Sequence, residues 1–130
     1  MKFMMLVKGA ESQGPPPRAL MEAIDRLAQE DPKDGMVRLD SGGLYPSAAS
    51  TRVRVDGGRV DGGRVVVIDG PFTEAKEVVG GYALFDAPSR DAALEGARRF
   101  MQLHADLWPG WTGETEVRQL FEPGEFKPGA

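Results

Sequence analysis

The sequence predicts a single α+β domain in which two strand–helix–strand units share one antiparallel sheet, with a hairpin inserted between them. Three observations support this prediction. The chain has 130 residues, which suits one domain. Its apolar side chains follow the period of strands in some segments and the period of helices in two others. Hydrophobic residues make up 41% and charged residues 28%, so the chain as a whole is not of the disordered kind.

The first unit begins with a strand and continues into a helix. Residues 2–8 are an apolar run with large side chains on both faces, which is typical of a strand in the middle of its sheet. After a proline-containing loop, Pro17 suits the first turn of a helix, where its missing N–H costs nothing. Asp31-Pro32 ends this helix. Its apolar residues recur at helical spacing: Leu20, Ile24, Leu27 and Ala28.

A weaker strand and a hairpin follow. Residues 36–44 are a strand candidate that is interrupted by a Ser-Gly-Gly sequence. Residues 51–55 and 64–68 are β-rich runs separated by two Asp-Gly-Gly turns, so they predict a hairpin. The sequence Val-Asp-Gly-Gly-Arg at 55–59 is repeated without change at 60–64. Because the repeat adds an odd number of residues, we expect it to bulge into the turn rather than enter the strands.

The second unit repeats the order of the first. Residues 78–85 form a strand whose Gly80-Gly81 pair predicts a bulge or a close backbone approach. Ser89 is a candidate N-cap for a helix that runs to about Leu107. Residues 114–121 alternate as a last strand. The buried stripe of the helix is expected to contain Ala93, Ala97, Phe100, Met101 and His104.

This order of elements gives the split βαβ, ferredoxin-like arrangement, formed by residues 1–121, with 122–130 as a peripheral C-terminal tail. Two helices cover only one face of such a sheet. Because the strands are apolar on both faces, the second face needs another cover, and a second copy of the same sheet is the simplest one. We therefore expect a homodimer that associates through the sheet face.

The composition excludes several kinds of partner and site. The net charge is −4 and no run of Lys or Arg occurs, so no nucleic-acid partner is expected. No apolar stretch approaches the roughly 20 residues of a membrane span, and no export signal is seen, so we expect a cytoplasmic protein. With no cysteine, one histidine and no strand–GxGxxG–helix unit, the chain is expected to hold no metal and no cofactor.

The segment after the hairpin has a distinctive sequence. Asp69-Gly70-Pro71-Phe72 is followed by Thr-Glu-Ala-Lys-Glu and then by Gly80-Gly81-Tyr82, and the chain opens with Met-Lys-Phe-Met-Met-Leu. In this pattern, which covers most of the chain, the sequence resembles the DGPF-domain, or YCII-related, proteins. The resemblance implies a dimeric α/β barrel of the ferredoxin-like kind. It implies no single activity: some relatives are thought to use a His–Asp pair in dehalogenation or a similar step, and others occur beside sigma factors.

The candidate catalytic residues are Asp69 and His104. The family's histidine lies in the first helix, whereas the only histidine of this chain lies in the second, so the family's pair does not transfer. His104 is either a structural residue of the buried stripe or a general base paired with a distant carboxylate, for which Asp69 is the candidate. Alternatively, Asp69 stabilises its own turn while Phe72 fills the core.

Three further residues are candidates for ligand binding. Glu74 and Lys76 follow the turn, where Lys76 would neutralise an anionic ligand unless the run is a solvated connector. Tyr82 offers a hydroxyl group to a cavity unless it only packs. Trp108 and Trp111 either wall a pocket or pack against the dimer partner, and packing is expected.

Three functional hypotheses follow. The first is an unidentified small molecule that is bound or transformed in a cleft between sheet and helices. The second is a non-catalytic sensor or partner module of a transcription regulator, such as the sigma factors of the resemblance, and the third is a purely structural dimer. A deep pocket that joins Asp69 and His104 favours the first hypothesis. A filled sheet–helix interface with an exposed apolar patch favours a partner module.

Overall fold

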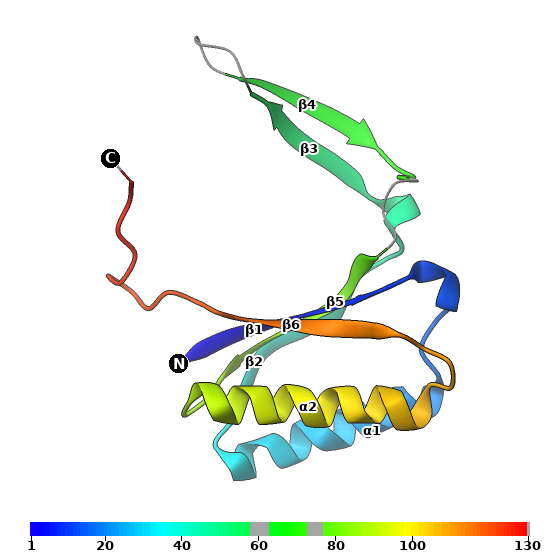
Figure 1. The fold of residues 1–130 in the computed structure, drawn as a ribbon, viewed down its shortest axis with the longest axis vertical. Coiled ribbons are helices and arrows are strands. Elements are labelled where there is room, and N and C mark those ends of the chain that lie inside the picture. Colours follow the sequence, from blue (N-terminus) through cyan, green and yellow to red (C-terminus); the bar gives the residue numbers. More distant parts are fainter. Residues whose placement is uncertain (58–62, 73–76, 130) are drawn as a thin grey trace.

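Two helices pack on one face of a four-stranded antiparallel sheet, and a separate two-stranded hairpin stands off from the other face (Figure 1). The structure is a computed structural model that describes residues 1–57, 63–72 and 77–129. It confirms the mixed α+β class predicted from the sequence, and its strand order is compatible with a ferredoxin-like fold.

The main sheet has the strand order β2-β5-β1-β6. Its strands are β1 (Lys2–Gly9), β2 (Val37–Gly43), β5 (Val78–Asp86) and β6 (Gly113–Gln119). The first strand pairs with β5 on one side and with β6 on the other. This central position confirms the expectation from its apolar residues on both faces.

The helices are α1 (Arg18–Glu30) and α2 (Arg90–Leu107). Short 3-10 helices flank α1, namely η1 (Glu11–Gln13) and η2 (Asp31–Asp34), and a third, η3 (Ser47–Ala49), follows β2. Ser89 caps α2 as predicted, because its Oγ accepts the Ala92 N–H at 3.1 Å. The core lies between the sheet and the helices, where Phe3 and Leu20 are fully buried. The Phe3 and Phe85 rings stack there with centroids 6.2 Å apart.

Two details of the sheet involve glycine. Strand β2 continues through the Ser-Gly-Gly sequence that was expected to interrupt it, because each of these residues pairs with β5. Gly42 lies under the Tyr82 ring, 3.3 Å from where a Cβ would stand, so a side chain fits poorly there. On the other side of β5, Val7 pairs with Gly81 and Lys8 with Val79, which leaves Gly80 as the extra residue of a bulge. The predicted bulge is confirmed.

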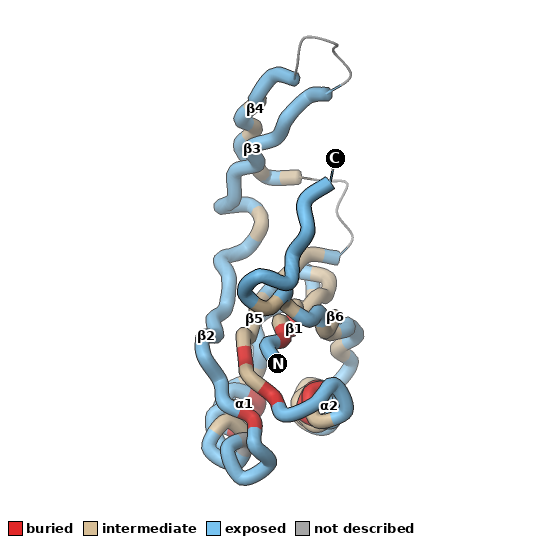
Figure 2. The backbone as a smooth tube through the Cα atoms, turned by 90° about the vertical axis from the view of Figure 1, so that its left-hand side faces the viewer, coloured by how far each residue is buried: buried red, intermediate tan, exposed pale blue. Residues whose placement is uncertain are grey.

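The hairpin consists of β3 (Thr51–Asp56) and β4 (Arg64–Asp69). Six pairs, from Thr51 with Asp69 to Asp56 with Arg64, follow one another without a shift in register. The predicted hairpin is therefore confirmed, while the expected bulging of the sequence repeat falls on residues 58–62, outside the described residues. Figure 2 shows the described hairpin as exposed over most of its length.

The face of the main sheet that points away from the helices is here called the outer face. Residue alternation and strand pairing place Met4, Leu6 and Leu84 at its centre, all of them half-buried. Polar pairs flank them: the Tyr82 hydroxyl donates to Asp40 at 3.0 Å, and the Lys8 ammonium lies 2.5 Å from a Glu116 carboxylate oxygen. None of the described helices lies on this face (Figure 1).

Candidate functional site

His104 occupies the last turns of α2 and is buried, with 5% of its surface exposed. Its Nδ1 lies 3.0 Å from the Phe100 carbonyl oxygen. Because a carbonyl oxygen only accepts hydrogen bonds, Nδ1 carries the proton of the neutral ring. The other nitrogen, Nε2, is then left with a lone pair that can accept a proton or a hydrogen bond.

Aromatic rings surround this histidine. Its ring centroid lies 4.8 Å from that of Phe100, 4.9 Å from Trp111 and 6.4 Å from Trp108, and the two indole rings stack 5.4 Å apart. We call these four residues the His104 cluster. Burial lowers the pKa of His104, and the hydrogen bond to Phe100 only partly opposes this. The ring is therefore neutral at pH 7. The two tryptophans pack on His104 within their own chain, and Trp111 also lines a hollow beside it. Their packing against a partner subunit stays a prediction.

A shallow hollow of about 330 Å³ lies beside the cluster, at the start of β6. It is lined by Met101, His104, Ala105, Trp111, Thr112 and Gly113. Gln13 of η1 holds this loop, since its amide accepts the Thr112 N–H at 2.8 Å and donates to the Thr112 carbonyl at 2.9 Å. No local sequence pattern predicts this contact, because the two residues are 99 positions apart.

Asp69 lies at the base of the hairpin, where its carboxylate accepts the Thr51 hydroxyl at 2.7 Å. The next residue, Gly70, follows a close backbone path: its N–H donates to Ser50 O at 2.9 Å, and a Cβ would stand 2.9 Å from Ser47 O. The Gly70–Pro71 peptide bond is cis. These contacts favour the structural interpretation of Asp-Gly-Pro-Phe over an active-site turn.

Phe72, which we expected to fill the core, lies outside the core cluster. The Arg52 guanidinium covers its ring instead, 3.6 Å from the centroid. The reason is topological. The hairpin stands off from the main sheet, so an aromatic residue after β4 packs on the hairpin's own arginine rather than under the helices (Figure 1).

Within one chain the structure does not bring Asp69 and His104 together. The histidine lies in α2 on the helix side of the main sheet, whereas the hairpin that holds Asp69 stands on the opposite side (Figures 1 and 2). Each side chain also has a partner of its own, Phe100 O and Thr51. A catalytic role for the two residues stays a prediction.

The remaining candidates lie elsewhere. Tyr82 is on the outer face, and its hydrogen bond to Asp40, together with the charge of that carboxylate, raises the pKa of the phenol. Tyr82 is thus a hydrogen-bond donor on the side of the sheet away from His104. Glu74 and Lys76 lie outside the described residues.

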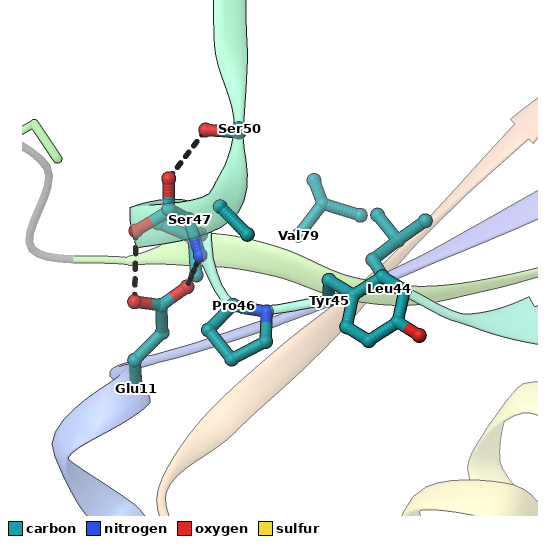
Figure 3. Close-up of a pocket in the computed structure, with 9 residues that line it drawn as sticks. Glu11, Leu44, Tyr45, Pro46, Ser47, Ser50 and Val79 are labelled. Carbon is teal, nitrogen blue, oxygen red and sulfur yellow. Dashed lines mark hydrogen bonds between the residues drawn. The ribbon is translucent and has the colours of Figure 1, made fainter. Parts of the chain in front are cut away.

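A second hollow, also of about 330 Å³, lies near the root of the hairpin (Figure 3). Its most polar feature is Glu11, whose carboxylate accepts both the Ser47 N–H at 2.6 Å and the Ser47 hydroxyl at 2.8 Å. The Ser50 hydroxyl donates to the Ser47 carbonyl at 2.5 Å. With both of its oxygens bonded to Ser47, this carboxylate connects η1 to η3. Tyr45 at the rim is 90% exposed.

The comparison with known proteins agrees with the resemblance found in the sequence. The model of the YCII-related domain matches residues 1–110. The chain belongs to the YCII-related family. An uncharacterized protein of Rhizobium meliloti (strain 1021) is 35% identical to this YCII-related chain over 108 residues, which cover 82% of the chain and 76% of the relative.

Two further properties of the described residues concern membrane spans and metal binding. In the described part of this YCII-related chain, neither helix is long and apolar enough to span a membrane. No group of three or more His, Asp and Glu side chains in residues 1–57, 63–72 and 77–129 is arranged to hold a metal ion.

Proposed function

We propose that this YCII-related protein is a homodimeric binding module whose subunits associate through the outer faces of their sheets. The observation that carries the proposal is the outer face itself. Met4, Leu6 and Leu84 form an apolar centre on it, and none of the described helices covers them. Packing of two sheets face to face is the usual way to bury such a surface.

The polar residues around this centre suit an interface. The Tyr82 hydroxyl already donates to Asp40, and the charges of Lys8 and Glu116 offset each other, so a second copy meets hydrogen-bonded polar groups at these positions. The hydrogen bond between Lys8 and Glu116 raises the pKa of Lys8 and lowers that of Glu116, so this pair stays charged at pH 7.

The contacts of the described residues favour a module over a His–Asp catalyst. The interface between sheet and helices is filled by the core, and the hollow at His104 does not extend to Asp69. This is the combination expected of a partner module rather than of an enzyme with that pair. The sensor role beside a sigma factor, which the resemblance implies, is one form that such a module would take.

The proposal is tested by sedimentation velocity at micromolar concentration. We expect a species of about twice the 14.1 kDa of one chain. Leu84→Arg places a charge at the centre of the outer face and should yield a folded monomer. Leu94→Arg is the matched control, since Leu94 is 41% exposed on α2, and it should remain dimeric. A monomeric wild-type chain contradicts the proposal.

A second candidate function is the binding of a small aromatic hydrogen-bond donor at the His104 hollow. It is favoured by one observation: the neutral histidine retains a lone pair on Nε2 beside two stacked indoles. The chain has one histidine, so a histidine-labelled sample gives a single imidazole signal in NMR spectra. Saturable shifts with phenol, and none with toluene, are expected. Identical responses to both probes contradict a polar site.

A further inference from the structure

The two faces of the hairpin are covered to different extents. One face carries Arg52, Arg54, Val66 and Ile68, and here the two aliphatic side chains are half-buried. Arg52 extends over the Phe72 ring, and Arg54 lies 3.3 Å from Asp56, so long polar side chains shield this face.

The opposite face, here called the valine face, has no such cover. It consists of Val53, Val55, Val65 and Val67, which are 64–68% exposed. Strand pairing sets them directly opposite one another as Val53 with Val67 and Val55 with Val65. They therefore form one contiguous apolar patch on a ribbon of two strands, an arrangement that is marginally stable in water without a packing partner.

The size of the patch bears on what covers it. Burying one valine corresponds to roughly 60–120 Å² of apolar surface, so four valines that are two-thirds exposed present roughly 150–300 Å². A stable specific interface takes about 800 Å² from each partner. The valine face is too small to hold a separate protein by itself, and it suits an extension of a larger interface.

Such a larger surface lies on the same side of the molecule. The hairpin rises from the main sheet on the side of the outer face, opposite the helices, in both views (Figures 1 and 2). We infer that the valine face packs against a second copy of this chain, the copy that docks on the outer face. The inference rests on the proposed dimer. In a two-fold pair each copy contributes one hairpin, so two valine faces are buried.

The chain has no cysteine, which allows a direct test by site-specific spin labelling. A nitroxide is attached at Val55→Cys in a copy without isotope labelling. This copy is mixed with a ¹⁵N-labelled copy of the wild-type chain. We expect paramagnetic broadening of amide signals in the ¹⁵N-labelled copy. A label at Leu94→Cys, on the exposed side of α2, is the matched control and should broaden none of the signals broadened from position 55.

The strength of the dimer gives a second readout. Replacing all four residues of the valine face with threonine keeps the strand propensity and should weaken dimerisation at least about tenfold in sedimentation equilibrium. Val66→Thr makes the same exchange on the shielded face of the hairpin and should leave the dimer Kd within about twofold.

The outcomes separate the two proposals. Broadening between copies together with a weaker dimer of the valine-face variant supports the inference. A dimer that is broken by Leu84→Arg, but that shows neither effect, overturns the inference and leaves the proposed sheet-to-sheet dimer standing. The valine face would then be exposed in the dimer. A monomeric wild-type chain overturns both proposals.

Discussion

Replacing Gly70 with alanine should strain the junction between the hairpin and η3. The added methyl group would lie 2.9 Å from the Ser47 carbonyl oxygen and 3.0 Å from that of Ser50. Both distances are shorter than an ordinary carbon–oxygen contact, and both neighbours are backbone atoms, which cannot turn aside as a flexible side chain can. Overpacking of this kind costs about 1–3 kcal/mol.

Urea unfolding followed by circular dichroism measures this cost. Hydrogen exchange of the amide at position 70 reports on the hydrogen bond that this N–H donates to the Ser50 carbonyl oxygen, with a nitrogen–oxygen distance of 2.9 Å in the wild-type chain. Gly57→Ala is the matched control. An added methyl group there meets no atom of the described residues within 4 Å, so the substitution should be neutral or stabilise by up to about 1 kcal/mol. If Gly70→Ala leaves both stability and exchange unchanged, the steric argument is refuted, and close approach of a ligand becomes the better reason for glycine at this position.

Three further outcomes are expected. Burial lowers the pKa of His104, so the unfolded chain binds more protons than the folded one in the pH range between the two pKa values. The contribution of His104 to stability is therefore full above about pH 6.5 and is lost as the pH falls toward and below the pKa of the folded state. Urea midpoints measured from pH 7.5 to 5 should show this loss, and His104→Gln should remove the pH dependence. Ser89→Ala should lower the free energy of unfolding by about 0.5–2 kcal/mol, and an unchanged melting temperature would contradict the cap. Gln13→Ala should lower the free energy of unfolding by about 0.5–1.5 kcal/mol, because the backbone of Thr112 loses two hydrogen bonds. It should also shift the tryptophan fluorescence, because Thr112 lies beside Trp111.

Local patterns were sufficient to predict most of the fold. Strand β1 has apolar side chains on both faces, a pattern that is visible in the sequence. This pattern predicted that β1 is central in the sheet, where it pairs with a strand on each side. Ser89 caps α2 through a residue three positions away, so the signal is local. Strand β2 was the weak prediction, because its Ser-Gly-Gly sequence has low strand propensity and pairing with β5 overrides it.

The candidate site was predicted only in part. The helical period placed His104 on the buried stripe of α2, and the structure confirms its burial. Its setting depends on long-range contacts such as that of Gln13 with Thr112, which no local pattern encodes. Asp69 was paired with His104 on chemical grounds alone, and the fold sets the two residues on opposite sides of the main sheet (Figure 1).

The Gly80 bulge has a consequence for how the chain tolerates changes in length. Side chains in a strand alternate between faces, so one extra residue reverses the alternation beyond it. On the hairpin side of the bulge Val79 faces the same way as Lys8, whereas on the far side the original phase continues through Tyr82 and Leu84. The bulge thus makes the side-chain alternation of one segment independent of that of the other. Insertions on the hairpin side can be absorbed there, and the residues that form the core keep their positions.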